Sequence, residues 1–191
     1  MKFPYGIQDF KQVITEDFFY CDRTDKIRTL EKTGKYLLFL RPRRFGKSLF
    51  LSMLKNYYDV ALADKFDEIF GHLLIGKNPT KLHNKYFILK FDFSRIDPTG
   101  TADDVKQSMY DEINASIEDF AVYYEEYLKH DIKINFENAL YSIRSLLTSV
   151  QMTPYSVYLL IDEYDNFANE VMIGIKNEKD NYKALVHEQG P

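Results

Sequence analysis

An apolar run, a polar turn and an apolar-periodic segment follow one another between residues 36 and 55, and this order constrains the fold more than any other feature. The run Tyr36–Leu40 has the length of a buried strand, and apolar residues recur at helical spacing from Leu49 onward. The turn between them contains Gly46, Lys47 and Ser48. A strand, a polar loop and a helix in this order are what a phosphate-binding loop requires.

The residue types of the turn each suit one task in phosphate binding. Gly46 lets the backbone approach an anion closely, Lys47 can pair with β- and γ-phosphate oxygens, and Ser48 can ligate Mg²⁺. Backbone N–H groups at the start of the following helix, and the helix dipole, also favour an anion there. The predicted nucleotide-binding residues are Arg41, Pro42, Arg43, Arg44, Phe45, Gly46, Lys47, Ser48 and Leu49.

The turn departs from the pattern G-x-x-x-x-G-K-[ST] at its first position, which is Arg41. Pro42 fixes its own φ, and Arg43 and Arg44 add positive charge near the expected phosphates. The alternative is a basic turn before an ordinary helix, because Gly-Lys-Ser also recurs by chance. The loop by itself favours nucleotide binding and leaves that alternative open.

A second apolar run, Val157–Ile161, ends in Asp162 and Glu163, which is the Walker B arrangement. Ligands of open α/β sheets bind at the carboxyl ends of the strands, so we expect both carboxylates at the same edge as the phosphate loop. Asp162 and Ser48 are the predicted Mg²⁺ ligands, and Glu163 is the predicted catalytic residue, which polarises the attacking water. The alternative, a solvated acidic turn, is disfavoured by the lysine loop.

The composition predicts one domain over residues 1–191 and limits its partners. With 45% hydrophobic residues the chain can bury one substantial core. The net charge of −4, with both signs interspersed, gives no electrostatic case for binding nucleic acid or an anionic membrane. No apolar run has the length of a membrane span and the chain starts no signal segment, so we expect a cytoplasmic protein. Cys21 is the only cysteine, and the four histidines show no ligand spacing.

The remaining chain alternates helical and strand patterns, which predicts an α/β, P-loop NTPase-like fold with a mostly parallel sheet flanked by helices. A second strand is expected at Tyr86–Phe93. Asp92 and Ser94 lie at its end, where they either reach the Mg²⁺ edge or cap the strand. Residues from about Ile14 to Leu30 lead into an expected helix whose apolar members Ile27 and Leu30 recur at helical spacing. Further helices are expected from the loop to about Ala61, from a cap at Thr101 or Asp103 to Tyr124, and over residues 136–150.

Four segments carry a resemblance to a known family: Phe3–Phe10, Tyr20–Asp25, Arg41–Leu49 and Leu160–Asp165. Together they resemble the AAA-ATPase-like family, P-loop proteins of bacteria and some archaea that commonly carry a C-terminal PD-(D/E)XK-type nuclease domain. The string Arg-Pro-Arg-Arg-Phe-Gly-Lys-Ser is the most specific of the four. The resemblance spans nearly the whole chain and implies that Arg41 is the family's own version of the loop.

The resemblance implies ATP and Mg²⁺ as ligands, and a further strand with a sensor-like polar residue after the Walker B strand. The sequence ends at Pro191 without such a strand, so we expect the N-terminal portion of the domain, truncated after the Walker B strand. A C-terminal nuclease-like domain is then a partner outside this chain. The resemblance implies no nucleobase preference and no oligomeric state.

Two functions of different classes remain open from the sequence. One is an ATPase that hydrolyses ATP in the full-length context to drive an attached effector domain, and that is weak or inactive as the isolated 191-residue chain. The other is a non-hydrolysing nucleotide-binding or interaction module, or a structural remnant. A catalytic arginine would discriminate them, and spacing alone does not place Arg95 or Arg144 in that role.

Overall fold

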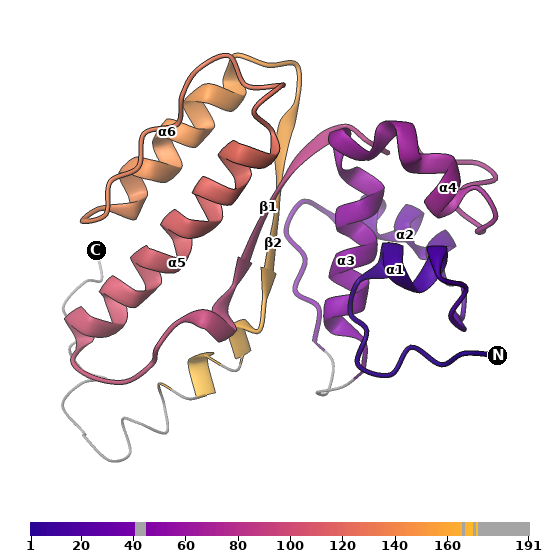
Figure 1. The fold of residues 1–191 in the computed structure, drawn as a ribbon, viewed down its shortest axis with the longest axis horizontal. Coiled ribbons are helices and arrows are strands. Elements are labelled where there is room, and N and C mark those ends of the chain that lie inside the picture. The colour runs from indigo at the N-terminus through magenta and orange to yellow at the C-terminus, as the bar shows by residue number, and fades with distance from the viewer. Residues whose placement is uncertain (41–44, 166, 170, 172–191) are drawn as a thin grey trace. The chain divides into compact units, whose positions relative to one another are not determined.

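The structure is a computed structural model of the chain that describes residues 1–40, 45–165, 167–169 and 171. The chain divides into two compact units, Met1–Ile88 and Leu89–Pro191, and each has buried apolar residues of its own. Figure 1 follows the chain from its indigo N-terminus to the yellow segment beyond β2. No helix among the described residues is long and apolar enough to cross a membrane.

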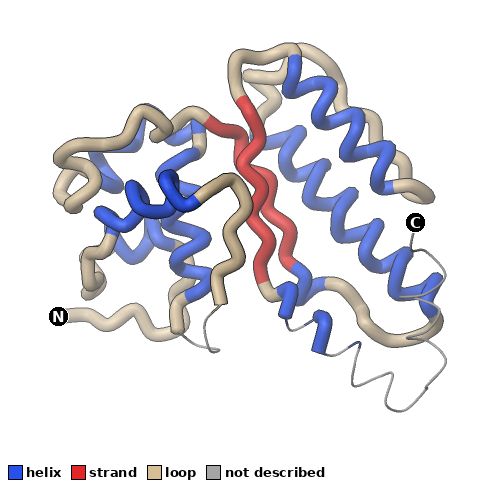
Figure 2. The backbone as a smooth tube through the Cα atoms, turned by 180° about the vertical axis from the view of Figure 1, so that it is seen from behind, coloured by secondary structure: helices blue, strands red, loops and turns tan. Residues whose placement is uncertain are grey.

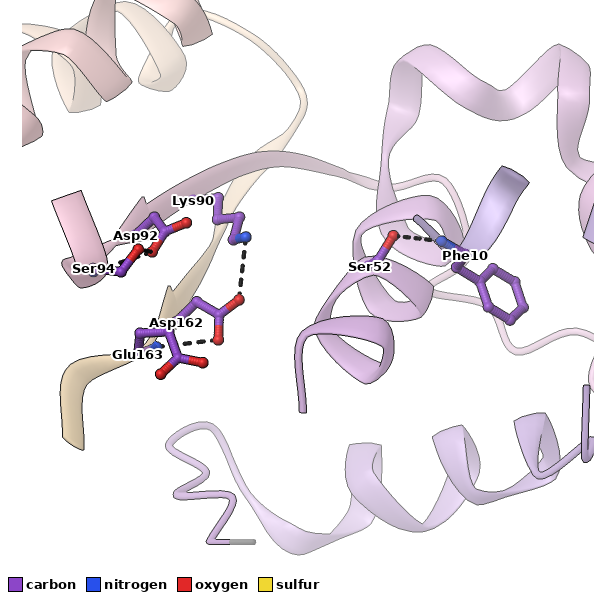
Figure 3. A network of polar contacts seen from close by, with 7 residues as sticks. All are labelled: Phe10, Ser52, Lys90, Asp92, Ser94, Asp162 and Glu163. Carbon is purple, nitrogen blue, oxygen red and sulfur yellow. Dashed lines mark hydrogen bonds and ion pairs between the residues drawn. The ribbon is translucent and has the colours of Figure 1, made fainter. Parts of the chain in front are cut away.

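The first unit is helical, with an aromatic core. Phe10 stacks on Phe70 at 5.4 Å between ring centroids, and Tyr57 meets Phe70 edge-on at 5.3 Å. The backbone N–H of Phe10 also donates to Ser52 Oγ at 2.8 Å, which joins α1 to α3 (Figure 3). The elements are α1 (Phe10–Thr15), η1 (Thr24–Lys26), α2 (Ile27–Thr33), α3 (Lys47–Tyr58), η2 (Val60–Lys65) and α4 (Phe66–Phe70).

A hydrogen-bonded clamp within this unit explains the segment Tyr20–Asp25. Asp22 Oδ1 accepts from the Thr24 backbone N–H at 2.9 Å and from the Thr24 hydroxyl at 2.7 Å. Asp22 Oδ2 accepts from Leu74 N at 2.7 Å, and Thr24 Oγ1 accepts from Ile75 N at 3.1 Å. Thr24 is fully buried, so these bonds fix the loop after α4 to the segment before α2.

Tyr20 packs beside the same clamp. Burial raises the pKa of Tyr20 to about 12, and the nearby Asp22 charge adds to the rise. The side chain therefore stays protonated near neutral pH, and its hydroxyl donates to Met53 Sδ of α3 at 3.5 Å. Tyr20 and Asp22 act as structural residues of this unit.

We expect Thr24→Val to lower the free energy of unfolding by about 1–3 kcal/mol, because the buried Ile75 N–H then lacks its acceptor. Thr33→Val is the matched control, since the Thr33 hydroxyl donates to Thr29 O on an exposed helix surface. That control should stay within about 0.5 kcal/mol of the parent. Urea unfolding of the three proteins measures the difference, and equal losses in both variants would remove the clamp as a stabilising feature.

The prediction of a buried strand at Tyr36–Leu40 is wrong. The described sheet consists of β1 and β2, and residues 36–40 have no strand conformation. Tyr36 is 97% exposed and Leu40 is 71% exposed, while Phe39 stacks on Phe50 of α3 at 4.5 Å. An apolar run becomes a strand only when a neighbouring strand pairs with its backbone, and local hydrophobicity does not supply that neighbour.

The sheet consists of two parallel strands, β1 (Tyr86–Asp92) and β2 (Ser156–Asp162), which lie side by side in Figure 2. After β1 the chain passes through η3 (Phe93–Arg95), α5 (Ala102–Tyr123) and α6 (Ala139–Gln151) before it returns as β2. The two helices pack against each other, and α6 also contacts β2. The predicted α/β class is thus confirmed as a small parallel sheet flanked by helices.

The long helix begins where its sequence signal predicts. Thr101 Oγ1 accepts from Asp104 N at 3.2 Å, and Asp104 Oδ2 accepts from Thr101 N at 2.8 Å, which is a complete capping box. Thr101 is therefore the cap, and Asp103 lies inside the helix. The Thr101 hydroxyl, which donates to Asp104 Oδ2 at 2.7 Å, and the Thr101 backbone N–H hold the pKa of Asp104 below its usual value.

The helix predicted to contain Ile27 and Leu30 is present as α2. A shorter helix, α1, precedes it, and Asp17, at φ 56°, turns the chain after α1. Two other predicted helix boundaries are corrected by capping. The loop helix ends at Tyr58, since Asp59 adopts an extended conformation and its side chain accepts from Ala61 N at 3.0 Å. The last helix starts after Asn138, whose side chain accepts from Tyr141 N at 3.3 Å.

Candidate nucleotide-binding and metal-binding residues

The start of α3 carries the predicted phosphate-binding residues. Gly46 has φ 77° and ψ 26°, in the left-handed region, and directly precedes Lys47 and Ser48, the first two residues of α3. The Gly46 carbonyl accepts the first helical hydrogen bond, from Phe50 N at 3.0 Å. Gly46 itself has no side chain that could cap the helix, and the first N–H groups of any helix lack acceptors within the helix. Glycine is required here for its backbone conformation.

Five of the nine predicted nucleotide-binding residues are described, and they are consecutive. Phe45 is exposed, Gly46 is exposed, and the side chains from Lys47 to Leu49 are half-buried. Arg41, Pro42, Arg43 and Arg44 lie outside the described residues. Gly46, Lys47 and Ser48 therefore lie in succession at the start of one helix, the part of a helix that attracts a phosphate.

The second unit positions the predicted metal ligand at the end of β2. Asp162 is the last residue of the strand and only 4% exposed. Its Oδ1 accepts from the backbone N–H of Glu163 at 3.1 Å, and its Oδ2 forms an ion pair with Lys90 Nζ at 3.2 Å (Figure 3). Both carboxylate oxygens are thus held in a fixed direction at the carboxyl edge of the sheet.

Glu163 follows in a conformation that non-glycine residues seldom adopt. Its φ of 55° bends the chain from β2 into the helical backbone that begins at Tyr164, at a cost on the order of 1 kcal/mol. The side chain is half-buried. Phe167 in the helical segment packs edge-on against Phe93 at 5.8 Å, which fixes this segment to the end of β1. Such stored strain is a common feature of functional turns.

The carboxyl end of β1 lies beside that of β2 because the two strands are parallel neighbours. Asp92 Oδ1 accepts from Ser94 N at 3.2 Å and from Ser94 Oγ at 2.7 Å (Figure 3). Asp92 thus caps the turn that follows β1, as the capping alternative predicts. Lys90, two residues earlier, is the functional candidate that sequence reasoning missed, although a lone lysine in the apolar strand Tyr86–Phe91 was a visible signal.

The side-chain chemistry of Asp162 suits a magnesium ligand. Mg²⁺ prefers oxygen ligands, and in nucleotide sites it takes one or two protein ligands together with phosphate oxygens. Asp162, in the second unit, carries a carboxylate that already faces a cation, Lys90. Ser48, in the first unit, carries a hydroxyl. The described residues contain no group of three or more His, Cys, Asp or Glu side chains that could hold a metal. Such a group is not needed where a nucleotide supplies the other ligands.

Comparisons with known proteins give a family match and a matching relative. One relative, described as "Uncharacterized protein in vnfD 5'region" from Azotobacter chroococcum mcd 1, is 41% identical over 58 residues, which cover 30% of this chain and 11% of that protein. The chain thus matches a small part of that relative's length. No solved structure matches the chain. A family model described as "Predicted AAA-ATPase" matches residues 4–187, so this chain belongs to the AAA-ATPase-like family.

Proposed function

We propose that this chain binds Mg²⁺–ATP and, in the full-length context, hydrolyses it to drive an attached effector domain. The observation that carries the proposal is the start of α3. Gly46 adopts the left-handed conformation there, and Lys47 and Ser48 are the first two residues of the helix. Membership of a family described as "Predicted AAA-ATPase" supports it. In this proposal residues 1–191 belong to a single P-loop domain.

The proposed phosphate-binding residues belong to the first unit. Backbone N–H groups of the first turn of α3 and the positive end of its dipole attract a polyphosphate. The Lys47 ammonium adds a full charge for the β- and γ-phosphate oxygens. Arg41, Pro42, Arg43, Arg44, Phe45 and Leu49 complete the proposed nucleotide-binding segment, in which the three arginines add charge that a triphosphate attracts.

The proposed metal-binding and catalytic carboxylates belong to the second unit. Asp162, with Ser48, is proposed to hold Mg²⁺, which when bound neutralises phosphate charge. Glu163 is proposed to accept the proton of the attacking water as a general base. The hydrogen bond from Glu163 N to Asp162 Oδ1 supports this division of roles, because it orients one carboxylate while the adjacent one remains half-exposed.

We expect Asp162→Asn to weaken binding of Mg²⁺–ATP about tenfold or more, because it removes the charge of a metal ligand, and to leave binding of ATP in EDTA unchanged. Asp97→Asn is the matched control: it makes the same charge change at an exposed turn, where Asp97 Oδ1 accepts from Thr99 at 2.6 Å. Titration calorimetry with and without Mg²⁺ measures both variants.

Two results of this titration would contradict the proposal. If the parent chain binds no ATP in either condition, the nucleotide-binding function is wrong. If Asp162→Asn and Asp97→Asn both bind Mg²⁺–ATP like the parent, nucleotide binding stands and Asp162 is not a metal ligand.

A further inference from the structure

Lys90 is a charged residue in an otherwise apolar stretch of β1. It lies between the buried residues Leu89 and Phe91 at an exposed position of the strand, and its side chain is 38% exposed. A partly exposed lysine can lay its aliphatic stem on apolar surface while its ammonium reaches a charged partner. That partner is Asp162, on the neighbouring strand, at 3.2 Å (Figure 3).

Lys90 pairs with the carboxylate of Asp162, the same group that is proposed to bind the metal. Asp162 is nearly fully buried, and a buried carboxylate is costly unless it is paired and hydrogen-bonded. Its Oδ1 is engaged by Glu163 N and its Oδ2 by Lys90 Nζ. A divalent cation can therefore use Oδ2 only by displacing the ammonium or by tolerating its repulsion.

We propose that Lys90 is a positioning residue of the metal site, which holds the Asp162 carboxylate in the metal-free chain and competes with Mg²⁺ for Oδ2. This inference rests on the proposed function, because it takes Asp162 as the metal ligand. This competition weakens the binding of Mg²⁺ that arrives without a nucleotide. Mg²⁺ that arrives with ATP brings phosphate ligands and displaces the ammonium at lower cost, so the site selects the Mg²⁺–nucleotide complex over the metal alone.

The test measures binding of Mn²⁺ alone, followed by electron paramagnetic resonance in the absence of nucleotide. The parent should bind Mn²⁺ weakly, and Lys90→Met should bind it about tenfold more tightly, because the competing charge is gone. Lys90→Arg keeps the charge and should bind as weakly as the parent. Lys129→Met, which removes an exposed lysine of the same unit, should also match the parent.

A second measurement covers the risk that Lys90→Met folds poorly. Lys90→Gln keeps a polar side chain without the charge, and Mn²⁺ should raise its thermal unfolding temperature by more than it raises that of the parent. A purely structural role for Lys90 gives the opposite result, because a disordered Asp162 would lower metal affinity. Lys90→Met combined with Asp162→Asn should lose the gained affinity.

The outcomes separate this inference from the proposed function. If Lys90→Met and Lys90→Gln bind Mn²⁺ no better than the parent, while Asp162→Asn still weakens Mg²⁺–ATP binding, the role of Lys90 is wrong and the proposed function stands. If the tighter Mn²⁺ binding persists in the double variant, the ion is not at Asp162 and the inference is wrong. If Asp162→Asn changes neither Mn²⁺ nor Mg²⁺–ATP binding, both the inference and the metal role of Asp162 fail.

Discussion

Lys47→Ala should weaken ATP binding by about 1.5–3 kcal/mol, roughly 10- to 150-fold, and leave adenosine binding unchanged. The reason is that the Lys47 ammonium, on the first residue of α3, acts on the phosphates and not on the base. Titration calorimetry with ATP, ADP and adenosine measures the effect, which should decrease in that order as the number of phosphates falls.

Lys55→Ala is the matched control for this prediction, because Lys55 is an exposed lysine at the other end of the same helix. It should bind ATP like the parent. Equal affinity of Lys47→Ala and the parent for ATP would contradict the assignment of a phosphate-binding loop. Equal losses in the two variants would indicate a general charge effect, which screening by salt would also reduce.

The elements predicted correctly are those whose signals are local. The capping box at Thr101 and the apolar periodicity after it specify α5 without reference to the rest of the chain. The runs at Tyr86–Asp92 and Ser156–Asp162 become strands because each is the other's hydrogen-bonded neighbour. The run at Tyr36–Leu40 has the same local pattern and no such neighbour in the described sheet, so the pattern alone predicted it wrongly.

The contacts that sequence reasoning missed all join distant residues. Asp22 and Leu74 are 52 positions apart, and no periodicity indicates that the Asp22 carboxylate accepts from that backbone N–H. Lys90 is visible as a charge in an apolar strand, but its partner Asp162 is known only once β1 and β2 are adjacent. The position of Gly46 at the start of a helix could be predicted, because a glycine directly before Lys-Ser is typical of the turn that leads into such a helix.

In the full-length context, where hydrolysis is proposed, Glu163→Gln should keep the affinity for Mg²⁺–ATP within about threefold of the parent and lower the turnover rate by about 10²–10⁴-fold, the usual contribution of a general base. Glutamine has the same shape and remains at the bend after β2, so the hydrogen bond from its backbone N–H to Asp162 Oδ1 is kept. The amide accepts no proton from water near neutral pH. Single-turnover conversion of labelled ATP, with protein in excess over nucleotide, measures slow hydrolysis directly.

Glu118→Gln is the control for charge, because Glu118 is an exposed glutamate of α5, and it should hydrolyse ATP like the parent. Lys47→Ala supplies the background rate. A Glu163→Gln protein with full activity would remove Glu163 from the mechanism. A full-length parent that binds Mg²⁺–ATP and yet releases no phosphate above the Lys47→Ala background would favour a non-hydrolysing nucleotide-binding module, in which the carboxylates at the end of β2 serve binding alone.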